Sequence, residues 1–189
     1  MDTPPLPSDL PVPVDDGAAD HLSGKSLPTT ALVATDGTTV NLAAATGRWV
    51  IYVYPRTGQP GVASPTGWNA IPGARGCTPQ SCSYRDHHRD FQALATRVYG
   101  LSTQTTEYQR EAKARLQLPF ELLSDTTLTL HTSLELPTFG VDGLTLYRRL
   151  TLVGCDDRIE AVFYPVFPPD ADAAQVLAWL QTHPPQDHG

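Results

Sequence analysis

The segment RWVIYVYP, residues 48–55, constrains the fold of this chain more than any other feature. It is rich in β-branched and aromatic residues, and both faces of the strand that it would form are apolar. Such a strand belongs inside a sheet that is covered on both sides, because a half-exposed strand would alternate apolar and polar residues. Pro55 ends the strand, since proline cannot donate to the ladder. The sequence therefore predicts a central sheet between two covering layers.

Further strands and helices alternate along the chain. Two β-rich segments that turn at Asp36–Gly37 predict a hairpin. The spacing of apolar residues predicts the other elements. Two of the helices also begin with capping pairs, Thr106 with Gln109 and Asp172 with Gln175. These other elements are strands at 97–104, 118–125, 148–154 and 158–167, and helices from Thr78, from Thr106, around 126–134 and from Asp172. This order predicts an α/β fold of the thioredoxin type, a central mixed β-sheet flanked by helices on both faces.

The composition divides the chain into an arm and one domain. Residues 1–27 are rich in proline and aspartate without periodicity, which predicts a loosely ordered, extended arm. Residues 28–189 are long enough for a single domain with a substantial core. Within it, residues 56–76 hold five glycines and three prolines, and a loop of this length inside a compact domain is often functional. This loop insertion leads directly to Cys77.

The charge and the cysteine count narrow the functional classes. A formal net charge of −7 argues against nucleic-acid binding, which needs lysine and arginine patches. No segment approaches the roughly 20 apolar residues of a membrane span, and the N-terminal segment lacks the basic start and apolar run of a secretory signal. We therefore expect a cytoplasmic protein that binds neither nucleic acid nor membranes. In the reducing cytoplasm, three cysteines indicate catalysis, metal binding or burial rather than a disulfide framework.

Cys77 and Cys82 stand five positions apart in the segment RGCTPQSCSYRDHH. Simple burial suits Cys155, at the end of a predicted strand, but it does not explain why a glycine- and proline-rich loop leads to Cys77. A zinc site would need His87 and His88 as further ligands. Those four side chains would crowd one helix and point in different directions, since adjacent residues are about 100° apart around its axis. The sequence therefore does not favour a zinc site here.

Thiol chemistry explains the positions of both cysteines. Thr78 is the expected N-cap and Pro79 suits the first helical position, which places Cys77 at the start of a helix. Backbone N–H groups without acceptors and the positive end of the helix dipole stabilise a thiolate there. Cys77 is therefore the expected nucleophile, and Cys82, about one turn deeper, is its less ionised partner.

The spacing also limits when the two cysteines can form a disulfide. Residues five apart on a continuous helix have Cα atoms about 8.7 Å apart by helix geometry, beyond the limit of roughly 7 Å for a disulfide. If both cysteines lie in the helix, its first turns must unwind before the bridge can form. The sequence thus predicts local unfolding as part of a thiol–disulfide cycle.

The chain resembles the peroxiredoxins of the Q, or bacterioferritin-comigratory, type. The resemblance spans residues 30–180 and rests on motifs in the family's order: YVYP at 52–55, GCTPQSCSYRD at 76–86, VYGLSTQ at 98–104, LPFELLSD at 118–125 and RLTLVG at 149–154. The second motif is specific, and the others are weak alone. The resemblance implies a thioredoxin-like fold and the thiol-dependent reduction of hydrogen peroxide and organic hydroperoxides without a cofactor.

The resemblance also implies roles for individual residues. Cys77 would attack the O–O bond of a peroxide and become a sulfenic acid, and Cys82 would condense with it to a disulfide. Thioredoxin or a similar dithiol would reduce that disulfide. The family also uses an arginine at the start of a late strand to hold the thiolate and the peroxide. The R-x-T-x-V pattern favours Arg149 over Arg148, and strand alternation lets one of the two face the site.

One part of the family pattern differs. The family carries a threonine three residues before the nucleophilic cysteine, where this chain has Ala74. Thr57, Ser64 and Thr66 of the loop insertion are candidate substitutes, and the sequence does not distinguish among them.

Two other functions stay open. One is a non-enzymatic redox sensor whose disulfide alters a partner contact. The other is a protein thiol–disulfide oxidoreductase, although such enzymes usually carry C-x-x-C. The expected assembly is a monomer or a weak homodimer.

Overall fold

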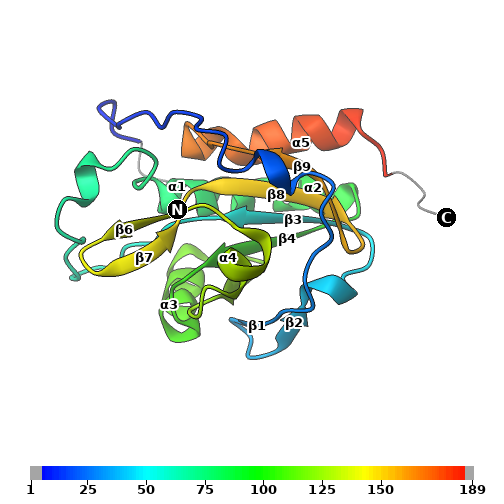
Figure 1. Cartoon of the computed structure of the whole chain (residues 1–189), viewed down its shortest axis with the longest axis horizontal. Coiled ribbons are helices and arrows are strands. Elements are labelled where there is room, and N and C mark those ends of the chain that lie inside the picture. The colour runs from blue at the N-terminus through cyan, green and yellow to red at the C-terminus, as the bar shows by residue number, and fades with distance from the viewer. Residues whose placement is uncertain (1–5, 186–189) are drawn as a thin grey trace.

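The structure is a computed structural model that describes residues 6–185. Its centre is a seven-stranded mixed sheet in the order β2-β1-β5-β4-β3-β8-β9 (Figure 1). β3 lies inside this sheet, parallel to β4 and antiparallel to β8. The strands are β1 (Ala31–Ala34), β2 (Thr39–Asn41), β3 (Arg48–Val53), β4 (Thr96–Ser102), β5 (Glu121–Ser124), β8 (Leu150–Cys155) and β9 (Arg158–Phe163).

Helices cover both faces of the sheet, and the predicted thioredoxin-like α/β fold is confirmed. The helices are α1 (Cys77–Asp86), α2 (His88–Ala93), α3 (Thr106–Leu116), α4 (Thr129–Leu134) and α5 (Asp172–Thr182). Apolar side chains of α1, α2, α3 and α5 pack into one core cluster, and those of α4 and the 3-10 turn η1 (Asp20–Leu22) pack into the cluster on the opposite face. None of the helices in residues 6–185 is both long and apolar enough to cross a bilayer.

The segment RWVIYVYP forms the buried strand that the sequence predicts. All six residues of β3 are buried. Val50 and Tyr52 pack into the cluster beneath α1 and α5, whereas Trp49 and Ile51 pack into the opposite cluster. Successive side chains of a strand point to opposite faces, so an apolar strand is stable here because both faces are covered. The strand ends just before the chain enters the loop insertion.

The helix α1 begins at Cys77, two residues before Pro79, which was the expected first helical position. Gly76 precedes it as the cap residue with φ of 102°, in the left-handed region. A Cβ at this position would also collide with the side chain of Pro169. Glycine therefore suits this position for both backbone and packing reasons, and Cys77 occupies the first helical position.

Two other helix predictions need correction. The helix predicted from Thr78 divides at His87 into α1 and α2. The helix α3 has Thr105 as its cap rather than Thr106, because the Thr105 side chain accepts the first-turn N–H of Tyr108.

The N-terminal arm is more ordered than predicted. Ala19, Leu22 and Leu27 are buried in the core cluster on the α4 face. The prediction of a loosely ordered arm is therefore wrong for residues 19–27, which belong to the packed core. The 3-10 turn that carries Leu22 is too short to produce a helical period in the sequence. Residues 1–5 of the predicted arm lie outside the described residues.

The loop insertion at 56–76 packs against a hairpin that the sequence analysis missed. This hairpin consists of β6 (Thr138–Val141) and β7 (Leu144–Tyr147). Trp68 and Ala74 of the insertion form a small apolar cluster with Val141 and Leu146 of the hairpin. The insertion contains a 3-10 turn, η3 (Trp68–Ala70), and no strand or α-helix, as predicted for a loop. Its fixed position brings the end of the loop against Cys77.

Gly154→Ala is expected to destabilise the sheet. A Cβ at this position of β8 would collide with the ring of Trp49 and with the backbone oxygen of Arg158. Overpacking of this kind costs about 1–3 kcal/mol, which at this chain length lowers the melting temperature by about 2–12 °C. Gly58→Ala is the matched control, because no atom lies within 4 Å of its added Cβ. Thermal unfolding followed by circular dichroism measures both, and an unchanged melting temperature for Gly154→Ala would contradict this packing.

Candidate active site

Cys77 lies where the loop insertion meets α1, and the residue is 3% exposed. Its Sγ lies 3.4 Å from the backbone N of Arg56 and 3.2 Å from Nη2 of Arg149, and both groups donate toward the sulfur. The first N–H groups of a helix have no intrahelical acceptor, and the helix dipole adds positive potential at this end. The surroundings of the sulfur therefore suit a negative charge.

Arg149 joins the start of β8 to the end of the loop insertion. Besides Cys77, its Nη2 contacts three consecutive backbone oxygens, those of Gly73 at 3.2 Å, Ala74 at 3.2 Å and Arg75 at 3.1 Å. Its Nη1 donates to Oε1 of Gln80 in α1. One buried guanidinium thus holds both the loop before Cys77 and the helix after it. The planar fork of arginine supplies these several donors in fixed directions, which a lysine cannot do.

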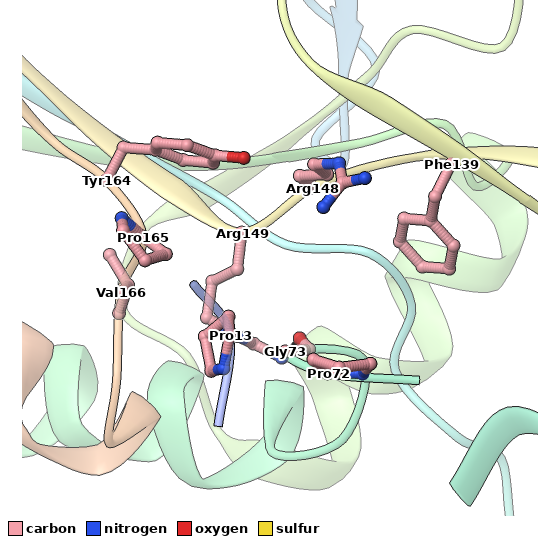
Figure 2. A pocket seen from close by; sticks show the side chains of 9 residues that line it. All are labelled: Pro13, Pro72, Gly73, Phe139, Arg148, Arg149, Tyr164, Pro165 and Val166. Carbon is pink, nitrogen blue, oxygen red and sulfur yellow. Dashed lines mark hydrogen bonds between the residues drawn. The ribbon is translucent and has the colours of Figure 1, made fainter. Parts of the chain in front are cut away.

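The neighbouring Arg148 has different surroundings. Its Nε donates to the backbone oxygen of Thr138 at 3.3 Å, and its Nη1 lies 3.9 Å from Asp16. Figure 2 shows Arg149 extending toward the loop at Gly73, whereas Arg148 leaves the backbone in another direction. The structure therefore brings Arg149, and not Arg148, into contact with Cys77.

The pocket drawn in Figure 2 lies beside Arg149 and has mainly apolar walls. Five segments line it: the N-terminal arm, the end of the loop insertion, β6, the connection between β7 and β8, and the segment that follows β9. The lining residues are Pro13, Pro72, Gly73, Phe139, Arg148, Arg149, Tyr164, Pro165 and Val166. The pocket therefore lies beside the residue that contacts the sulfur of Cys77.

Cys82 lies in the same unbroken helix as Cys77 and is 2% exposed. Both cysteines are free thiols, and both pack in the apolar cluster beneath α1. Ser81, between them, accepts a hydrogen bond from Tyr52 at 3.1 Å, and the ring of Tyr52 stacks on Tyr84 at 4.4 Å. Both cysteines lie within α1, which is the condition under which the sequence predicts unwinding before disulfide formation. The contacts of Ser81 and Tyr84 hold this part of the helix to the sheet.

The candidate hydroxyls of the loop insertion lie in unlike surroundings. Thr57 is buried, and its hydroxyl donates to Oε1 of Gln104 at 3.1 Å. Ser64 and Thr66 are exposed. None of the three hydroxyls forms a hydrogen bond with Cys77 or Arg149 in the described part of the chain. In place of a loop hydroxyl, the backbone N–H of Arg56 donates to the sulfur of Cys77.

Two buried polar residues of the site were missed by the sequence analysis, Gln80 and Asp172. Asp172 was expected to cap α5, but its side chain makes no cap bond and is fully buried. Its Oδ2 accepts hydrogen bonds from Gln80 at 2.8 Å, Tyr84 at 3.0 Å and Thr151 at 2.8 Å. Burial raises the pKa of Asp172, and these hydrogen bonds and the charge of Arg149 oppose that rise. An aspartate at a helix start so commonly caps the helix that the sequence carried no sign of this role.

The remaining cysteine and the two histidines lie apart from the sulfur of Cys77. Cys155 ends β8, and burial raises the pKa of its thiol. Six residues of strand separate it from Arg149, which is roughly 20 Å at 3.3 Å per residue. Nδ1 of His87 lies 2.9 Å from the backbone oxygen of Ser83. Among residues 6–185, no cluster of three or more histidine, cysteine or acidic side chains could hold a metal ion.

Comparisons with known proteins place this chain in a family. The Redoxin family model matches residues 22–177. Peroxiredoxin Q of Oryza sativa subsp. japonica, a chloroplastic protein, is 26% identical over 186 residues, which cover 95% of this chain and 78% of the relative. Peroxiredoxin Bcp of Bacillus subtilis is 27% identical over 141 residues, which cover 72% of this chain and 80% of the relative.

A solved structure supports the fold. The bacterioferritin comigratory protein of Xanthomonas campestris, described for its alkyl peroxide reduction activity, superposes with a TM-score of 0.66 at 19% identity. The match covers 94% of this chain and the whole of that one. The matched segment of the Redoxin model contains Cys77, Cys82 and Arg149. The chain therefore belongs to the redoxin family, and within it to the peroxiredoxins of the Q and Bcp type.

Proposed function

We propose that this peroxiredoxin reduces peroxides at Cys77, with Cys82 as the resolving cysteine and Arg149 as the residue that holds the sulfur and the peroxide. The observation that carries the proposal is the contact of 3.2 Å between Nη2 of Arg149 and Sγ of Cys77 at the first position of α1. A sulfur held among backbone N–H groups and a guanidinium is prepared for nucleophilic attack. The same donors can stabilise the charge that develops on the peroxide oxygens.

The sulfur of Cys77 can itself carry the two electrons that reduce the peroxide. The Cys77 thiolate attacks one peroxide oxygen, an S–O bond forms, the O–O bond breaks, and the leaving oxygen takes a proton to depart as water or an alcohol. The Cys82 thiol then attacks the sulfenic sulfur, forming a disulfide and releasing water. A dithiol of the thioredoxin type reduces this disulfide by exchange and is itself oxidised.

Disulfide formation requires α1 to open. Cys77 and Cys82 occupy one continuous helix, where Cα atoms five residues apart lie about 8.7 Å from each other. The first turns must therefore unwind, and the Tyr52–Ser81 hydrogen bond must break, before the two sulfurs can meet. Local opening of this kind is cheaper than global unfolding, and it would also bring the buried disulfide to the surface, where a dithiol can reach it.

The burial of Cys77 bears on the alternative functions. A protein thiol–disulfide oxidoreductase must present its nucleophilic sulfur to a protein substrate, and a residue that is 3% exposed does not do so while α1 is intact. A peroxide, unlike a protein substrate, is small enough to reach a buried sulfur. A redox sensor would share the same first step, and the two functions differ in whether a dithiol reductant sustains rapid turnover.

Cys82→Ser tests the proposed order of events. We expect this variant to react once with hydrogen peroxide or cumene hydroperoxide, at a rate within about threefold of wild type, because Cys82 is not involved in the first attack. Stopped-flow fluorescence measures the rate, and trapping with dimedone followed by mass spectrometry detects the sulfenic acid that accumulates.

Cys155→Ser is the matched control and should form the disulfide as wild type does, because Cys155 lies at the far end of β8. Continued turnover of Cys82→Ser with a thioredoxin-type reductant at the wild-type rate would contradict the role of Cys82. Slow oxidation of wild type without sustained turnover would favour the sensor.

A further inference from the structure

Gln80 connects Arg149 to Asp172 through the buried interior. It lies in the first turn of α1, three residues after Cys77, and is fully buried. Its Oε1 accepts from Nη1 of Arg149, and its Nε2 donates to Oδ2 of Asp172 at 2.8 Å. A carboxamide has one accepting end and one donating end, arginine only donates, and a carboxylate only accepts. One orientation of the Gln80 amide therefore satisfies both neighbours.

Asp172 is held in place independently of Gln80. Its Oδ2 also accepts from the hydroxyls of Tyr84 in α1 and Thr151 in β8. Its other oxygen, Oδ1, has no hydrogen-bond partner among residues 6–185. A proton on the carboxyl group would therefore reside on Oδ1, and Oδ2 would still accept from Gln80. The orientation of the amide does not depend on the charge of Asp172.

Loss of this acceptor would affect the active site through Gln80. Without Oδ2 of Asp172, nothing at that end holds the Gln80 amide, and a flipped amide would present its NH₂ group to the N–H groups of Arg149. Donors facing donors repel, so the guanidinium would shift away from a position that places Nη2 3.2 Å from the sulfur of Cys77. Displacements of about 1 Å in an active site can cost roughly 100-fold in rate.

We propose that Asp172 is a positioning residue of the peroxidase site, which orients the Gln80 amide so that this amide holds the Arg149 guanidinium against Cys77. This proposal rests on the proposed function of Cys77 and Arg149, and it assigns a role to a residue of α5 that does not touch the reacting atoms.

The test compares two reactions of the same sulfur in the Cys82→Ser background, where oxidation stops after one step. Hydrogen peroxide needs Arg149 to hold its oxygens. Iodoacetamide needs only the thiolate, which keeps the Arg56 N–H and the first turn of α1 as donors when Arg149 shifts. For Asp172→Ala we expect the rate constant with hydrogen peroxide to fall about 10- to 100-fold, and the alkylation rate constant to fall by less than about threefold. Asp172→Asn retains an acceptor oxygen, because the three surrounding donors orient it, and should keep the peroxide rate constant within about threefold.

Two controls separate positioning from general damage to the fold. Asp125→Ala removes an equally buried carboxylate on the opposite face of the sheet, where it accepts from Tyr147 at 2.6 Å. It should lower the melting temperature and leave the ratio of the two rate constants unchanged. In an Arg149→Ala background, Asp172→Ala should have almost no further effect on the peroxide rate constant, because a residue that acts through Arg149 has nothing left to position.

Other results would overturn the proposal. Equal losses in the peroxide and alkylation rates of Asp172→Ala, equal losses for the Asn and Ala variants, or full additivity with Arg149→Ala would each do so. If Asp172→Ala does not fold, Gln80→Leu is the second variant. It removes the amide that links Asp172 to Arg149 and must show the same selective loss of the peroxide rate. Rapid single oxidation of the parent Cys82→Ser protein supports the proposed function by itself, so its failure and the failure of the Asp172 proposal are distinguishable.

Discussion

Replacing Cys77 by serine is expected to abolish peroxide reduction. Serine fits the same buried space, so the fold should be retained, but its hydroxyl is a far weaker nucleophile. Its oxygen also cannot give two electrons to the peroxide and regain them from the dithiol, as sulfur does. Removal of a catalytic nucleophile commonly costs a factor of 10⁴ or more, so the rate should fall by at least about that factor. Peroxide consumption in the presence of a thioredoxin-type dithiol measures this loss.

Cys155→Ser is the control for Cys77→Ser. It replaces a cysteine that is also buried, at the opposite end of β8, and should keep full turnover. A melting temperature close to that of wild type would show that Cys77→Ser remains folded. Residual turnover above about one per cent in folded Cys77→Ser protein would assign the chemistry to another group and would remove the basis of the proposed function.

Arg149→Ala is expected to lower the rate constant of the first oxidation by about 10²–10³, the usual cost of losing one preorganised donor to a developing charge. The substitution also leaves three backbone oxygens of the loop, at Gly73, Ala74 and Arg75, without their common donor. Arg149→Lys keeps the charge but cannot reproduce the fork, so it should still lose at least about tenfold. Single-turnover stopped-flow kinetics in the Cys82→Ser background measures both variants.

Arg148→Ala is the matched control for these variants. It removes the adjacent arginine, whose side chain is 41% exposed and does not contact Cys77. We expect a rate constant with hydrogen peroxide within about twofold of the parent protein. Equal losses for Arg148→Ala and Arg149→Ala would mean that the net positive charge of this region, rather than the contact with the sulfur, supports the reaction.

The features that the sequence predicted correctly are those that short segments determine locally. The apolar pattern of RWVIYVYP required burial on both faces, and β3 is buried on both faces. The Asp36–Gly37 turn joins β1 to β2 as expected. Cys77 was expected at the start of a helix, and the two cysteines do share one helix, although it begins two residues early because Gly76 takes the left-handed cap position.

Other features depend on contacts between distant segments and left no local pattern. Residues 19–27 pack into the core because apolar side chains such as Leu22 contact residues of later strands. An aperiodic segment carries no pattern that predicts such contacts. The β6–β7 hairpin is held against the loop insertion by a small cluster around Trp68. Both were missed because their stability comes from partners far away in the chain.

The sequence by itself determined the reactive groups: two cysteines five apart at a helix start, and an arginine pair before a late strand. The tertiary structure decided how these groups meet. It placed the guanidinium of Arg149, rather than that of Arg148, against the sulfur. It also buried Asp172 where its carboxylate hydrogen-bonds to Gln80, which in turn hydrogen-bonds to Arg149. The physical reason is the direction of hydrogen bonds, since a donor or acceptor acts at one point in space that several segments build together.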